Sequence, residues 1–214
     1  MKITKFGHCC LLLEVDGVRI LTDPGSFTTA QNDIMGLDAV LITHSHHDHY
    51  HAESVPQIVK NNPQAVFITN GEVGELLKKE GVAYTKVSDG ESAVVKGIKI
   101  EGFGKEHKKV YKDIPSLENT GYFVAGKLYF PGDAFYNPHK VVDILALPVA
   151  GPWMQSSETI EYAKEICPRT SFPVHDGMIR KEFTVWFEYG VIKTALAESN
   201  IEFISLREGE IKEF

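Results

Sequence analysis

The stretch from Thr43 to His51 constrains this chain more than any other, because it holds five of the nine histidines. It follows directly on the apolar run from Ala39 to Ile42, which is typical of a buried strand. Its regular part is His44-x-His46-x-Asp48-His49, which places four side chains able to bind a metal within six residues. This pattern predicts a metal-binding loop at the end of a strand.

The spacing within this loop has a physical logic. If the strand continues to His44, then His44 and His46 share a face by the two-residue period and can bind the same metal. Asp48 and His49 follow where the chain must turn, so they can be directed to a second metal. Imidazole and carboxylate suit zinc, and three protein ligands plus a water leave an open, catalytic position. A solvated, tag-like histidine tract is the alternative, but a tag lies at a terminus and lacks the interleaved aspartate.

Length and composition favour one soluble globular domain spanning residues 1–214, with a net charge of −7. This charge argues against general affinity for nucleic acid, which depends on neutralising phosphates with lysine and arginine. No apolar run approaches the ~20 residues of a membrane span, and Leu11-Leu12-Leu13 is too short for a signal peptide. Three cysteines offer no disulfide framework. We therefore expect a cytoplasmic protein with a small-molecule partner, while the sequence leaves its oligomeric state open.

Further candidate residues stand where other predicted strands end. They are Asp23 after 18–21, His107 after 98–103, Asp133 after 128–130 and His175 after 171–174. The alternative for each aspartate taken alone is an ordinary turn residue, and the alternative for each histidine is a solvated or strand-end residue without a metal. Strands and helices alternate along the chain. Because such elements bury their apolar faces by packing in layers, this order predicts an α/β or α+β fold.

The spacing His44-x-His46-x-Asp48-His49 after an apolar strand resembles the signature of the metallo-β-lactamase-fold hydrolases. The segments Gly7-His8-Cys9-Cys10 and Leu21-Thr22-Asp23-Pro24 resemble the branch that includes lactonase-like and N-acyl-phosphatidylethanolamine phospholipase-like members. The resemblance spans essentially the whole chain. It implies a four-layer αβ/βα sandwich.

The resemblance also implies a site with two Zn²⁺ ions per chain, with Mn²⁺ or Fe as alternative metals. Its ligands would be His44, His46 and His107 on the first metal, Asp48, His49 and His175 on the second, and Asp133 bridging both. It assigns Asp48 the orientation of a bridging hydroxide and Asp23 the support of the ligand loop. His8 stays open between a supporting hydrogen bond and an ordinary strand histidine.

The function implied is that of a dinuclear hydrolase, in which a metal-bridging hydroxide attacks an ester, lactone, amide or phosphodiester. Two zinc ions, two aspartates and one hydroxide leave a charge of roughly +1, which favours small anionic substrates. Trp153 could form an apolar wall and Arg180 could pair with an anionic group, although core or surface roles fit each of them as well. Ala134 follows Asp133 where many members have Thr or Ser, which leaves the substrate class open.

Three alternatives remain beside this interpretation. A metal-dependent nuclease fits the same ligands, but the short chain leaves little room for an RNA-binding arm. A diiron or persulfide-type oxidoreductase fits less well, because His46 stands where the diiron proteins usually carry a carboxylate. A non-catalytic metal-binding or ligand-binding module would bind metal without turning over any ester, lactone or phosphodiester.

Overall fold

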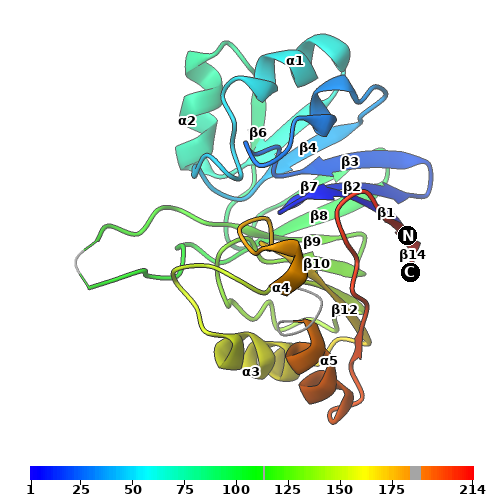
Figure 1. The fold of residues 1–214 in the computed structure, drawn as a ribbon. Helices are drawn as coiled ribbons and strands as arrows, with labels where there is room; N and C mark the ends of the chain where they lie inside the picture. Colours follow the sequence, from blue (N-terminus) through cyan, green and yellow to red (C-terminus); the bar gives the residue numbers. More distant parts are fainter. Residues whose placement is uncertain (113, 184–188) are drawn as a thin grey trace.

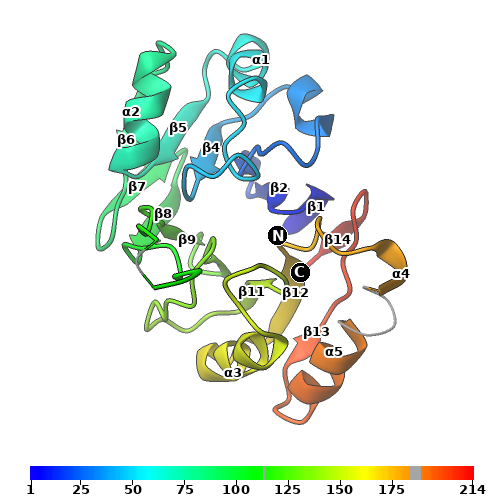
Figure 2. The same cartoon turned by 60° about the vertical axis from the view of Figure 1, so that its left-hand side comes forward.

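The computed structural model describes residues 1–112, 114–183 and 189–214. The described residues form two seven-stranded sheets. Helices cover their outer faces (Figures 1 and 2). This arrangement confirms the predicted α/β sandwich. None of the described helices combines the length and apolarity that crossing a bilayer requires.

The first sheet is built from both ends of the chain. Its strands in spatial order are β14 (Ile211–Glu213), β1 (Lys2–Gly7), β2 (Cys10–Val15), β3 (Val18–Thr22), β4 (Ala39–Ile42), β5 (Val66–Thr69) and β6 (Tyr84–Lys86). Pairing is antiparallel from β14 to β3 and parallel from β3 to β6. The connections between the parallel strands contain η1 (Ala30–Asp33), α1 (Ser54–Asn61) and α2 (Gly71–Lys79).

The second sheet repeats this plan strand for strand. Its order is β7 (Ser92–Val95), β8 (Ile98–Phe103), β9 (Gly121–Val124), β10 (Leu128–Phe130), β11 (Ile144–Pro148), β12 (Thr170–Val174) and β13 (Glu202–Phe203). Pairing is antiparallel from β7 to β10 and parallel from β10 to β13. The helices of this half are α3 (Ser156–Ile166), α4 (Lys181–Phe183) and α5 (Tyr189–Ala197). Position by position, β1 therefore corresponds to β8, and β3 corresponds to β10.

Apolar side chains fill the space between the sheets and the space under the helices. Alternation along β2 shows how this works, because Leu11 and Leu13 join the cluster between the sheets. Leu12 points the other way, into the cluster shared with α1 and α2. A third cluster lies between the second sheet and helices α3 and α5. A strand that is buried on both faces has a continuous apolar sequence, as Ala39–Ile42 shows.

A buried ion pair connects the two halves. Lys5 on β1 is fully buried, and its Nζ donates to Asp176 Oδ2 at 2.7 Å and to the Pro173 carbonyl at 2.8 Å. Asp176 also accepts a hydrogen bond from the Tyr189 hydroxyl. The pair therefore fixes the turn after β12, which carries His175.

Candidate metal centre

The predicted ligands meet at one edge of the sandwich, where loops from both sheets converge. They form two adjoining groups, in each of which the potential ligand atoms lie within 4.8 Å of one another. The first group is His44, His46, His107 and Asp133, and the second is His8, Asp48, His49 and His175. The structure thus brings all seven predicted ligands together and adds His8.

A glycine allows the loop after β3 to press against the metal loop. A Cβ on Gly25 would lie 1.7 Å from the Asp48 carbonyl oxygen, so no other residue fits there without displacing the backbone. Beside it, the Ser26 amide donates to the His47 carbonyl at 2.9 Å. The loop after β3 therefore supports the backbone that carries Asp48 and His49.

Asp23, expected to support the ligand loop, accepts three hydrogen bonds from it. The Thr43 amide and the Thr43 hydroxyl each donate at 2.8 Å, and His49 Nδ1 lies 2.6 Å from Asp23 Oδ2. Because the Thr43 hydroxyl gives its hydrogen to Asp23, it can only accept from His44 Nδ1, 3.0 Å away. Asp23 thereby orients both rings: in the neutral form of His44 and of His49 the proton is on Nδ1, and both Nε2 atoms are directed to the centre.

Two further rings are held in the same way by backbone carbonyls. His107 Nδ1 lies 2.6 Å from the Lys108 carbonyl oxygen, and His175 Nδ1 lies 2.5 Å from the Ala150 carbonyl oxygen. A carbonyl only accepts, so the proton of each neutral ring is on Nδ1. Each Nε2 therefore carries a free lone pair.

These lone pairs point at Asp133. Its carboxylate lies 3.2 Å from His49 Nε2, 3.3 Å from His107 Nε2 and 2.8 Å from His175 Nε2. All three Nε2 atoms and Asp133 Oδ1 are buried and have no hydrogen-bond partner among the described residues. Acceptors that face each other repel unless a cation lies between them, and imidazole nitrogen and carboxylate oxygen are ligands that zinc accepts. The donor set therefore fits a divalent metal.

The electrostatics of the centre also favour a cation. Burial opposes the charge on Asp133, but the rings of His49 and His175 hold the pKa of its carboxyl well below the usual range. Burial likewise opposes protonation of His49, yet Asp133 and Asp23 raise the pKa of that ring well above its ordinary value. Burial lowers the pKa of His44, which keeps it in the neutral form that binds metals. The buried carboxylates thus attract positive charge to the rings around them, either as a proton on His49 or as a metal ion that takes its place.

His8 plays a different part from the other rings. Burial lowers its pKa to about 4, so the ring is neutral near pH 7. The Gly177 amide donates to its Nδ1 at 3.1 Å, which places the ring proton on Nε2. That Nε2–H then donates to Asp48 Oδ2, 3.1 Å away. His8 therefore orients Asp48, and the sequence signal for it was the Gly7-His8 pair at the end of a strand.

The two candidate substrate contacts lie in different surroundings. Trp153 is buried, and its indole Nε1 donates to Asp133 Oδ2 at 2.9 Å. The edge of the ring packs against His107 and His175. Arg180 is exposed in the turn before α4, and no side-chain contact among the described residues joins it to the centre.

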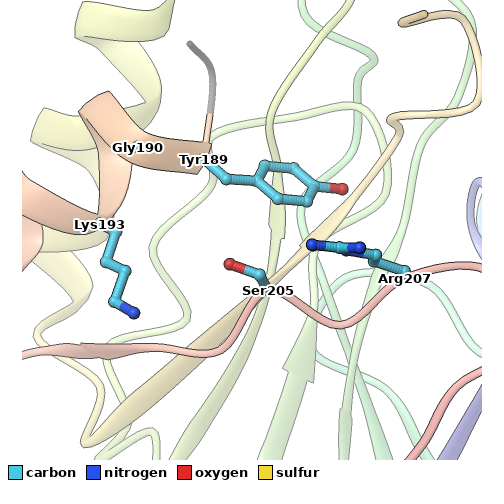
Figure 3. Close-up of a pocket in the computed structure, with 5 residues that line it drawn as sticks. All are labelled: Tyr189, Gly190, Lys193, Ser205 and Arg207. Atoms are coloured by element: carbon cyan, nitrogen blue, oxygen red, sulfur yellow. The ribbon is translucent and has the colours of Figure 1, made fainter. Parts of the chain in front are cut away.

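A separate cavity of about 180 Å³ lies beside α5. Its lining residues are Tyr189, Gly190, Lys193, Ser205 and Arg207. Figure 3 shows the Tyr189 hydroxyl and the Arg207 guanidinium on one side of this cavity and the Lys193 side chain on the other. The cavity includes none of the candidate ligands, and its link to them runs through the hydrogen bond from Tyr189 to Asp176.

Comparisons with known proteins agree with this geometry. A family model described as "Beta-lactamase superfamily domain" matches residues 2–175. Protein Rv0786c of Mycobacterium tuberculosis is 34% identical over 184 residues, covering 84% of this chain and 85% of the relative. The UPF0173 metal-dependent hydrolase Ta0764 of Thermoplasma acidophilum is 26% identical, with 82% and 83% covered.

Two further similarities bear on the branch and the fold. N-acyl-phosphatidylethanolamine-hydrolyzing phospholipase D 1 of Caenorhabditis elegans is 25% identical over 81% of this chain and 63% of the relative. A crystal structure from Parabacteroides distasonis superposes with a TM-score of 0.78 at 26% identity, covering 97% of this chain and 93% of the other. The chain therefore belongs to the metallo-β-lactamase-fold superfamily, in the branch with phospholipase-like members that its sequence predicts.

Proposed function

We propose that this protein is a dinuclear metal-dependent hydrolase of small, anionic substrates. The observation that carries the proposal is the set of buried, unpartnered ring nitrogens around Asp133. Such atoms are costly to bury unless something binds them. The name of the relative from Thermoplasma acidophilum, a metal-dependent hydrolase, supports the same reaction class.

In this proposal the two groups of side chains each hold one metal. His44, His46 and His107 would bind the first and Asp48, His49 and His175 the second, with Asp133 shared between them. Two divalent ions bound there would supply a hydroxide nucleophile at neutral pH and neutralise negative charge that develops on the substrate oxygen.

The protein's own groups would position the reactants. Burial works against ionisation of Asp48, but the hydrogen bond from His8 and the nearby His49 lower its pKa, so it stays a carboxylate. A carboxylate held in this way accepts a hydrogen bond from the attacking water and fixes its direction. The buried indole of Trp153 lies against Asp133 and excludes water from that side of the centre.

The charge of the loaded centre supports an anionic substrate. With two zinc ions, two aspartates and one hydroxide, the charge is roughly +1. The loop after β8 also carries the exposed Lys109 and Lys112, which follow His107 in the sequence. We infer that the substrate is a carboxylate-bearing or phosphate-bearing ester, lactone or amide, or a phosphodiester, rather than a neutral molecule.

Elemental analysis of protein purified without added metal tests this proposal first. We expect about two zinc or manganese ions per chain, together with chelator-sensitive hydrolysis of bis-p-nitrophenyl phosphate or of a member of a lactone panel. Two bound metals without turnover of any ester, lactone or phosphodiester would favour a non-catalytic binding module. Failure to bind any metal, even on reconstitution, would overturn the assignment.

A further inference from the structure

Cys9 lies directly beside the candidate centre. It follows the turn at Gly7 and His8, where both residues have positive φ angles of 147° and 52°. Its side chain is 1% exposed and belongs to the cluster between the sheets. Its sulfur, one ring nitrogen of His49 and one carboxylate oxygen of Asp133 all lie within 4.8 Å of one another.

The neighbouring Cys10 shows what an ordinary buried cysteine looks like in this fold. It is equally buried, with 2% exposed, but it joins the cluster under α1 and α2 on the opposite face of the first sheet. No group of potential ligands among the described residues includes it. Two adjacent cysteines therefore have the same burial and different chemical surroundings.

The surroundings of Cys9 favour a positive charge independently of the thiol. His49 Nε2 and Asp133 Oδ1 are 3.2 Å apart, and neither has a hydrogen-bond partner among the described residues. Two donors on the same tetrahedral zinc ion, each about 2.0–2.3 Å from it, lie about 3.3–3.8 Å apart. The Cys9 sulfur lies within 4.8 Å of one ring nitrogen of His49 and of one carboxylate oxygen of Asp133, so a shift of the sulfur by about 1 Å would bring it to this spacing.

We propose that Cys9 supplies a thiolate ligand to the metal held by His49 and Asp133. The inference rests on the proposed function, because it takes the metal pair as given. A thiolate lowers the charge of the loaded centre from roughly +1 to about 0, so an anionic substrate would then bind through open metal positions rather than through net charge. As the sulfur–metal bond forms, the thiol proton is released to solvent, since the thiolate is the form that binds metals. A sulfur ligand makes this metal position favour thiophilic ions such as Zn²⁺, Co²⁺ and Cd²⁺ over Mn²⁺ and Mg²⁺.

X-ray absorption at the zinc edge tests the ligand directly, without depending on activity. The wild type loaded with zinc should show a sulfur shell at about 2.3 Å besides nitrogen and oxygen at about 2.0–2.2 Å. The shell should disappear in Cys9→Ser and persist in Cys10→Ser, its matched control. If Cys9→Ser fails to fold, a double variant provides the test instead. Cys10→Ala with Cys167→Ala keeps Cys9 as the sole cysteine and should retain the sulfur shell.

A second measurement addresses the choice of metal. Competition between Cd²⁺ and Mn²⁺ should favour Cd²⁺ in the wild type, and Cys9→Ser should reduce that preference at least about tenfold, since even supporting residues change metal affinity about 10–100-fold. Two bound zinc ions with only nitrogen and oxygen neighbours would overturn the role of Cys9 and leave the proposed function intact. A chain that binds no metal would instead remove the proposed function, which distinguishes the two failures.

Discussion

Asp23 and Asp133 occupy equivalent places in the two sheets, after β3 and after the corresponding strand β10. Both side chains are buried. Asp23 is surrounded by donors, accepting from Thr43 twice and from His49. Asp133 instead faces the Nε2 atoms of three histidine rings and keeps one oxygen without a partner among the described residues. The two aspartates have equivalent positions and similar burial, so their neighbours decide their roles. Hydrogen-bond donors occupy Asp23, which supports the ligand loop, whereas Asp133 keeps an oxygen that can bind a metal.

Histidines show the same contrast between the two halves. His8 follows β1 and His107 follows the loop after the corresponding strand β8. At Nδ1, His8 meets a backbone amide, whereas His107 meets a backbone carbonyl. The amide forces a proton onto Nε2 of His8, and the carbonyl leaves Nε2 of His107 free. The backbone group at Nδ1 therefore decides the role of each ring. His8, which faces an amide, orients a metal ligand, and His107, which faces a carbonyl, can itself bind a metal.

Replacing Asp133 with asparagine should give the largest effect. The substitution removes the charge shared by both proposed metals and places amide hydrogens among ring nitrogens. We expect a loss of turnover beyond the about 10–100-fold that a supporting residue costs, with reduced metal content. Hydrolysis rates and metal analysis measure this. Asp143→Asn, which alters a partly exposed carboxylate paired with Arg169, is the matched control. Wild-type turnover by a metal-counted Asp133→Asn protein would disprove the assignment.

Asp23→Asn tests the supporting role at the equivalent position. An asparagine amide facing His49 Nδ1 reverses the ring tautomer and puts a proton on Nε2, where the metal should bind. Metal affinity should fall about 10–100-fold, which isothermal titration with zinc measures. Asp38→Asn is the control, because Asp38 is also buried and bonded to a backbone amide, that of Arg19, but lies before β4. Equal loss of zinc affinity in both variants would show a general stability effect instead.

His8→Leu should lower kcat about 10–100-fold by freeing the Asp48 carboxylate, with little change in KM. His8→Gln restores one donor to Asp48 and should recover part of that loss. The exposed His139 provides the control variant His139→Gln. If His8→Leu and His139→Gln behave alike in steady-state kinetics, the orienting role is wrong.

The sequence predicted those features that depend on neighbours along the chain. The ligand loop from His44 to His49 was recognisable because its spacing is dense and follows an apolar strand, and the sandwich was confirmed. The division of roles between Asp23 and Asp133 depends on donors delivered by tertiary structure. The amide that sets the His8 tautomer belongs to Gly177, 169 residues away. Strand β6, short and largely exposed, carried no apolar pattern to reveal it.

Trp153→Phe should give the smallest effect. It tests whether the indole competes with the metal for Asp133 or orients its carboxylate. Among the residues that the structure describes, the indole Nε1–H is the only donor with a hydrogen bond to a side-chain oxygen of Asp133. Phenylalanine keeps an aromatic ring against His107 and His175 but removes the hydrogen bond. A hydrogen bond to a charged carboxylate contributes about 1.5 kcal/mol or more, so metal affinity or kcat should change by about tenfold. Because Asp133 loses a competing donor, its oxygens become more basic, and we expect the metal to bind more tightly rather than more weakly. Zinc titration of the two proteins measures the sign, and weaker binding would mean that the indole acts mainly by orienting the carboxylate.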